Sequence, residues 1–348
     1  MNNVSLKSIK YESIKAIFSA VVNSDGIRRS EISELTGLSL VTVGKIADAL
    51  HEQGIIFQDK PASDHVGRRA SVININESKF AIIIDLTSYD FSCSLLNLRM
   101  NPMHKLEYTY KTSASYRENF GVFLGEIQKY LQKSGRYNNC IGFGISVPGT
   151  YDKTAGKATY ANIPELSTID LRAEIETVFS DKLVVINSQT NSAAKFNIDS
   201  LANKQDKSIL YWYLSKEYIG GAFSVDGNLI SGKNSGYCDF GSMLVYEDLT
   251  LLDKIKFVKN QKECCEAILP TMHNVIKILN PHIVIMELDT NYPVDGILSD
   301  INNKLAMKYR IKSDQMPEFI YALTGHNSSY SGLALELREL WIDNIVFS

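Results

Sequence analysis

The chain has 348 residues, of which 45% are hydrophobic and 22% charged, and its formal net charge is −3. This is the composition of a globular protein long enough for two or three domains. The sequence holds no run of 18 apolar residues and no apolar leader, so we expect a cytoplasmic protein without a membrane span. Its five cysteines are odd in number and form no C-x-x-C pair, which argues against a disulfide framework or a zinc site.

Two helices are predicted near the N-terminus. The first carries apolar residues at positions i, i+3, i+4 and i+7, namely Ile14, Ile17, Phe18 and Val21. The run Asn23–Gly26 then breaks this pattern. Ser30 is placed to cap a second, short helix that carries Ile32 and Leu35 on its apolar face. Gly37 would end that helix in the left-handed conformation.

A third helix is predicted between a cap at Ser39 and a stop at Gly54, with an apolar face of Val43, Ile46, Ala47 and Leu50. Two helices joined by a glycine-containing turn form a helix-turn-helix, whose second helix enters the DNA major groove. The residues predicted to contact DNA are Ser39, Leu40, Val41, Thr42 and Lys45. Gly44 lowers helix propensity, and either close approach of the backbone to DNA or a neutral substitution would account for it.

A strand, a polar loop and a second strand follow the third helix. The strands are predicted at Ile55–Phe57 and Ser71–Ile75, which is the pattern of the wing in a winged helix. Arg68 and Arg69 follow a glycine near the end of the loop. We expect the two arginines to enter an A·T-rich minor groove, and the alternative is a solvated surface pair.

A series of short motifs continues in order along nearly the whole chain. The N-terminal ones are LSLVTVGKIADALHEQGII and GRRASVININ, and the later ones include IGFGISVPGTYD, ANIPEL, NSAAKF, IGGAFSVDGNLISGKNSGYCDFGSM, LNPHIVIM and YSGLALEL. Together they resemble the ROK family of repressors, open reading frames and kinases. This resemblance implies an α/β protein in which a winged helix-turn-helix precedes an actin-like ATPase (ribonuclease H-like) domain of two lobes.

The resemblance divides the chain into predicted domains. Residues 1–77 would form the DNA-binding domain, 78–195 the first lobe, and 196–330 the second lobe, through which we expect the protein to dimerise. A C-terminal helix within 331–348 would pack back on the first lobe. Local patterns predict strands at Phe80–Leu86, Phe91–Leu98, Leu106–Lys111, Cys140–Val147, Leu183–Ile186, Ile209–Leu214, Ile219–Val225 and Ile283–Leu288. One helix face is predicted from Phe120, Phe123, Leu124, Ile127 and Leu131.

The residues that a kinase of this family would use are altered. The resemblance aligns the first phosphate turn, D-x-G-G-T, with Asp85–Tyr89, which lacks both glycines. The second phosphate loop falls at residues 214–222, where Glu217 would repel a phosphate. Gln189 stands in place of the catalytic aspartate, and an amide cannot accept the substrate's proton. Ser242 replaces a zinc-site histidine, so we expect no catalytic residue, no metal and no cofactor.

By the same resemblance, a set of residues falls at or beside the family's sugar contacts. It comprises Gly149, Asn162, Gln189, Asn191, Asp239 and Ser242. Asp239 replaces the usual glutamate and Ser242 the usual histidine, which would reshape the site. Two interpretations remain open, an altered site for a sugar or sugar-phosphate inducer and a vestigial cleft. The run Tyr211-Trp212-Tyr213 could stack on a ligand or belong to the core.

The sequence therefore predicts a transcriptional regulator that binds double-stranded DNA and represses genes of carbohydrate metabolism. We expect a homodimer or tetramer on an A·T-rich, pseudo-palindromic operator, because symmetric half-sites need a symmetric protein. Two alternatives remain, a divergent carbohydrate kinase and a DNA-binding dimer that takes no ligand. Phosphate transfer to sugars would identify the first, and the absence of any stabilising sugar would identify the second.

Overall fold

The computed structural model describes residues 6–59, 71–159, 163–232, 237–289, 296–323 and 328–347. Its N-terminal part, the winged-helix unit, consists of α1 (Leu6–Val22), β1 (Ile27–Arg28), α2 (Arg29–Thr36), α3 (Leu40–Glu52), β2 (Ile56–Asp59) and β3 (Val72–Ile75). The three strands form an antiparallel sheet in the order β1-β3-β2. The predicted apolar faces of the first and third helices are buried in this unit, so both helix predictions are confirmed.

The second helix departs from its prediction. α2 begins at Arg29, so Ser30 is not its cap, and the Glu31 carboxylate instead accepts the Arg28 N–H at 2.7 Å. Leu35 is 71% exposed, and Ile32 is the apolar residue that the helix buries. The helix has only eight residues, and its Ile32 side faces the core of the unit. Gly37 ends the helix at φ +69°, as predicted.

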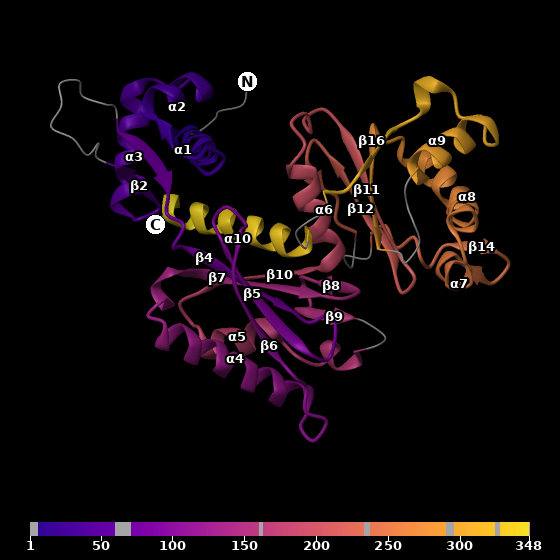
Figure 1. The fold of residues 1–348 in the computed structure, drawn as a ribbon, viewed down its shortest axis with the longest axis horizontal. Helices are drawn as coiled ribbons and strands as arrows, with labels where there is room; N and C mark the ends of the chain where they lie inside the picture. Colours follow the sequence, from indigo (N-terminus) through magenta and orange to yellow (C-terminus); the bar gives the residue numbers. More distant parts are fainter. Residues whose placement is uncertain are drawn as a thin grey trace.

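Lobe 1 is built on a five-stranded sheet in the order β10-β7-β4-β5-β6. Its elements are β4 (Phe80–Asp85), β5 (Phe91–Asn97), β6 (Pro102–Tyr108), α4 (Tyr116–Lys133), β7 (Cys140–Val147), β8 (Thr150–Asp152), β9 (Lys157–Thr159), α5 (Leu171–Val178) and β10 (Leu183–Ser188), with short 3₁₀ turns at Tyr137–Asn139 and Pro164–Ser167. All eight residues of β7 are buried because helices cover both faces of the sheet, and such strands carry continuous apolar runs. α4 and α5 cover one face, and α10 (Ser328–Phe347) covers the other (Figure 1).

Lobe 2 repeats this topology with a different sequence. Its sheet order is β13-β12-β11-β16-β17, with two antiparallel pairs followed by two parallel pairs. Lobe 1 has the same pattern when its order is given from the other edge, β6-β5-β4-β7-β10. Its elements are β11 (Ser208–Ser215), β12 (Ile219–Val225), β13 (Asn228–Leu229), β14 (Leu244–Tyr246), β15 (Leu249–Thr250), α7 (Leu251–Lys256), α8 (Gln261–Leu279), β16 (Ile283–Asp289), α9 (Ile297–Met307), a 3₁₀ turn at Ser313–Gln315 and β17 (Glu318–Tyr321). α6 (Gln189–Asp199) lies between the lobes in the sequence.

One strand of lobe 1 is displaced from its prediction. β6 spans Pro102–Tyr108 rather than Leu106–Lys111. It starts early because the Asn97 side chain closes a tight turn, accepting the N–H groups of Arg99 and Asn101. It ends early because the Asn119 side chain takes both backbone groups of Lys111 away from the sheet.

The long helix α10 joins the three parts of the molecule. It runs from beside α6 across the lobe 1 sheet to the winged-helix unit (Figure 1). Its apolar residues Leu333, Leu337 and Ile342 belong to one continuous cluster that also includes Ile83 of lobe 1 and Ile17 of α1. The winged-helix unit and lobe 1 therefore share a hydrophobic core. Across the described ranges, no helix has both the length and the apolar character needed to span a membrane.

Candidate functional site

The first turn of α3 presents the residues predicted to read DNA. Ser39 caps the helix, because its hydroxyl accepts the Thr42 N–H at 3.2 Å, and the Thr42 hydroxyl lies 2.9 Å from the same oxygen. Leu40 is 57% exposed and Val41 68%, although both are apolar, and Lys45 is also exposed. Exposed apolar side chains beside a hydroxyl and a cation suit thymine methyls and phosphates. Arg68 and Arg69 lie outside the described residues.

Gly44 has a structural explanation that differs from both sequence interpretations. A Cβ on Gly44 would lie 3.2 Å from Nη1 of Arg29. The Arg29 side chain comes from α2 and reaches Asp48 of α3 at 2.5 Å and the Gln58 amide oxygen of β2 at 3.1 Å. This contact with Arg29 lowers the pKa of the Asp48 carboxyl. The glycine thus leaves space for an arginine that ties both helices to the wing.

A cleft opens between the two lobes where the end of β7, the start of α6 and the β11–β12 turn meet. Its volume is about 380 Å³, within the range of small-molecule sites. Gly149, in a left-handed turn at φ +68°, and Gln189, the first residue of α6, both line it. Its other lining residues are Thr87, Pro148, Thr190, Tyr213, Ser215, Lys216, Glu217 and Tyr218.

In a kinase of this family the turn at Asp85–Tyr89 would bind phosphate, but here its polar groups form hydrogen bonds within the protein. One oxygen of the Asp85 carboxylate accepts the Thr87 N–H at 2.8 Å. The other accepts the hydroxyl of Tyr330, from the start of α10, at 2.5 Å. Burial, followed by the Asp85 charge, raises the pKa of Tyr330, so its hydroxyl remains a donor. Both carboxylate oxygens are therefore engaged within the protein.

The polar groups of the second phosphate loop, residues 214–222, also form hydrogen bonds within the protein. The Ser215 hydroxyl accepts the N–H groups of Glu217 at 3.3 Å and Tyr218 at 3.0 Å, and it donates to the Tyr218 carbonyl at 3.0 Å. A phosphate cradle needs such N–H groups to point at the ligand. Here they point at a serine, and the exposed Glu217 adds negative charge to the cleft wall.

The predicted sugar residues do not form a single lining. Asn191 lies in a separate cavity of about 270 Å³, which Glu336 of α10 also lines. Asp239 and Ser242 are exposed and bond to each other, the Ser242 hydroxyl donating to the Asp239 carboxylate at 2.6 Å. Neither Asp239 nor Ser242 lines the cleft in the described part of the chain. Asn162 lies outside the described ranges.

Two aromatic residues line the cleft, and they bear on the role of Tyr211-Trp212-Tyr213, which the sequence left open. Tyr211 and Trp212 are fully buried in the core, whereas Tyr213 lines the cleft. Tyr218 also lines it and contacts Thr190 of α6, and burial raises the pKa of its hydroxyl. The sequence interpretation missed Thr190, Tyr218 and Tyr330, although all three lie in or beside its motifs, because a motif does not show which side chains meet in the folded chain. The described part of the chain brings no three His, Cys, Asp or Glu side chains together around a metal position.

The chain is similar to proteins named as xylose repressors. The one from Bacillus spizizenii is 23% identical over 239 residues, which cover 68% of this chain and 61% of that protein. The one from Staphylococcus xylosus is 22% identical over 277 residues, which cover 76% of this chain and 68% of that protein. The match to the Bacillus spizizenii protein thus spans less than two thirds of its length.

Solved structures share the fold. A ROK family transcriptional regulator, a homologue of the E. coli Mlc protein, has a TM-score of 0.73 at 11% identity and covers 98% of this chain and 100% of its own. A ROK hexokinase from Thermus thermophilus has a TM-score of 0.56 at 14% identity, covering 74% of this chain and 97% of its own. The model of the ROK family matches residues 81–269, more than half of the sequence. The chain therefore belongs to the ROK family.

Proposed function

We propose that this protein is a transcriptional repressor that binds an operator through α3 and the wing. The observation that carries the proposal is the exposed first turn of α3, where the side chains of Leu40 and Val41 are exposed to solvent beside the capping Ser39. Buried positions of the same helix are all apolar, so this exposure is a feature of one face and not of a poorly packed helix. The relatives named xylose repressors support a role in carbohydrate metabolism.

The operator that fits this proposal has two inverted half-sites. A homodimer or tetramer would place one winged-helix unit on each half-site, and lobe 2 is the part proposed to join the subunits. Arg68 and Arg69 would enter the minor groove beside each half-site, which favours A·T-rich DNA. We assign the domains accordingly, with residues 1–77 as the DNA-binding part, 78–195 with 331–348 as the first lobe, and 196–330 as the second.

The cleft is proposed to bind a sugar or sugar-related inducer without phosphorylating it. Its lining keeps amide, hydroxyl and aromatic groups, which recognise hydroxylated ligands. Gln189 stands at the position where a kinase of this family has its general base, and internal hydrogen bonds occupy the groups of both phosphate turns. Loss of a general base alone lowers a rate by about 10²- to 10⁴-fold. With ATP and a panel of sugars, we expect no phosphate transfer above a protein-free blank, and turnover that Gln189→Ala abolishes would contradict this.

A ligand in the cleft should stabilise the folded protein. Screening xylose and other sugars by thermal shift should identify one that raises the melting temperature, because a ligand at about 100 Kd adds about 2.7 kcal/mol. Gln189→Ala should then weaken its binding by about 10-fold, the effect of about one lost hydrogen bond. Gln132→Ala, an exposed glutamine on α4, is the matched control and should bind like the parent. If no sugar stabilises the protein, the ligand-independent dimer is the better account.

A further inference from the structure

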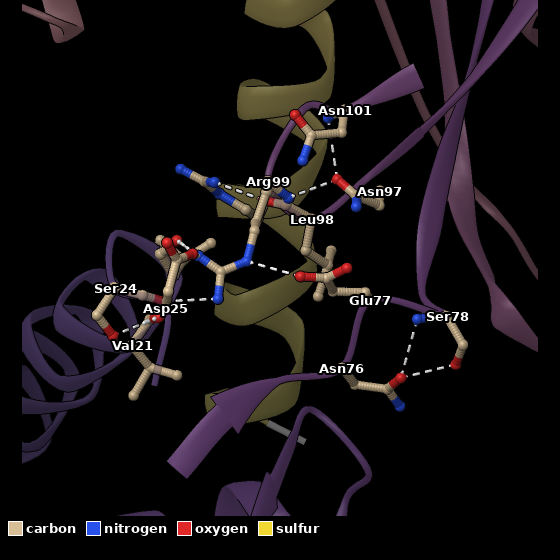
Figure 2. A network of polar contacts seen from close by, with 12 residues as sticks. Val21, Ser24, Asp25, Asn76, Glu77, Ser78, Asn97, Leu98, Arg99 and Asn101 are labelled. Atoms are coloured by element: carbon tan, nitrogen blue, oxygen red, sulfur yellow. Dashed lines mark hydrogen bonds and ion pairs between the residues drawn. The ribbon is translucent and has the colours of Figure 1, made fainter. Parts of the chain in front are cut away.

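The turn between β5 and β6 carries an arginine that reaches out of lobe 1 to the winged-helix unit. Nη1 of Arg99 donates to the carbonyl of Val22 at 2.7 Å, and Nη2 donates to the carbonyl of Ser24 at 2.6 Å (Figure 2). Its Nε donates to the Glu77 carboxylate at 3.0 Å, and Asp25 lies 3.8 Å from Nη1. The Arg99 side chain is 14% exposed, so these contacts are largely shielded from water.

Val22 is the last residue of α1, and Ser24 lies in the turn that follows it. The carboxyl end of an α-helix carries partial negative charge and unpaired carbonyl acceptors. The last turn of α1 contains no basic residue of its own. Arg99, which follows 77 residues later in the chain, supplies the missing cation and caps the helix from another domain. Because Glu77 lies in the segment that joins the two parts, the same guanidinium also holds the connection between them.

The arginine is itself held in position by its own turn. The Asn97 side chain accepts the N–H of Arg99 at 3.0 Å, and the Leu98 carbonyl accepts Nη1 of Arg338 from α10 at 2.8 Å. The Arg338 guanidinium also lies over the ring of Phe18 of α1, 5.6 Å from its centroid. Lobe 1, α10 and α1 therefore meet at this turn, and each contributes to holding Arg99 against the helix end (Figure 2).

We propose that Arg99 is a positioning residue for DNA binding, which clamps the winged-helix unit to lobe 1 so that the two move as one body. The clamp adds directional, charge-assisted bonds to the shared apolar core, and such bonds fix an orientation that apolar contact alone leaves adjustable. In the dimer, a fixed orientation sets the distance and angle between the two α3 helices. Arg99 would thus determine which half-site spacing the protein accepts, a consequence that rests on the proposed repressor function.

The test begins without DNA, using hydrogen exchange on the full chain. Arg99→Gln removes the charge and most of the donors. Amides in residues 97–101 and 338–345, which the winged-helix unit covers, should exchange about 10-fold faster, while amides of α3 keep their protection. Arg117→Gln is the matched control, since the exposed Arg117 forms an ion pair with the partly buried Glu174 within lobe 1. Exchange equal to this control, or equal acceleration in α3, would overturn the clamp whether or not the protein binds DNA.

The second measurement uses an operator selected from random DNA and a version with one extra base pair between its half-sites. That insertion moves one half-site by about 3.4 Å and about 34°. The insertion should lower the affinity of the wild-type protein by at least about 10-fold. For Arg99→Gln, the ratio of the affinities for the original and the lengthened operator should be below about 3-fold. Arg99→Lys, which keeps the charge, should give an intermediate ratio. An unchanged ratio in Arg99→Gln would overturn the positioning role.

Discussion

Replacing Val41 with aspartate should abolish sequence-specific DNA binding while leaving the fold intact. Val41 is 68% exposed in the first turn of α3, so the change removes no core contact, and a carboxylate near a helix N-terminus is favourable for the fold. On DNA, the same carboxylate would replace an apolar base contact and face the phosphates. Losing one base contact and adding repulsion should raise Kd by at least about 100-fold, measured by fluorescence anisotropy at fixed salt.

The matched control is Val122→Asp. Val122 is 49% exposed on α4 of lobe 1, so it receives the same change of charge and volume on another helix surface. Its operator affinity should remain within about 2-fold of the parent, because exposed substitutions outside the interface have little effect. Equal losses in the two variants would mean that net charge, rather than the α3 surface, governs binding.

The largest expected effect on stability is that of Gly332→Ala. A Cβ on this residue of α10 would overlap the backbone carbonyl of Ser192 in α6, and backbone cannot give way as a flexible side chain can. The two helices would have to separate, which should lower the free energy of unfolding by about 2 to 3 kcal/mol, in the upper part of the range for overpacked cores. Chemical denaturation followed by circular dichroism would measure the change.

Gly125→Ala provides the comparison for this effect. Gly125 lies within α4, and a Cβ there would meet nothing within 4 Å. Alanine is the better helix former, so this variant should be more stable by about 0.5 to 1 kcal/mol. If Gly332→Ala did not lower stability relative to Gly125→Ala, the close packing of α10 on α6 would not be a determinant of the fold.

Elements with strong local signals could be predicted from the sequence. The cap at Ser39 and the apolar face of α3 occur as expected. β7 has its predicted bounds because its run of mainly apolar and small residues is a clear signal for a buried strand. The misplaced β6 reflects the side chains of Asn97 and Asn119, which fix turns through bonds that periodicity does not encode. The repeated topology of the two lobes leaves no sequence repeat, because many apolar sequences can form the same buried strands.

The candidate site was less predictable than the fold. Gly149 and Gln189 do line the cleft, but Asn191 faces another cavity and Asp239 bonds to a neighbouring serine. A motif gives the order of residues along the chain and not the direction in which each side chain points. Contacts such as Tyr330 with Asp85 join positions 245 residues apart, so only the folded structure can reveal them.

Operator recognition by the α3 surface can be tested by selecting binding sites from random double-stranded DNA with the purified full chain, and in parallel with Val41→Asp. We expect the parent to enrich sequences with two inverted half-sites at a fixed spacing, and the variant to enrich none. If the parent enriched no sequence, or if both proteins enriched the same sequences, the proposal that the α3 surface reads an operator would be contradicted.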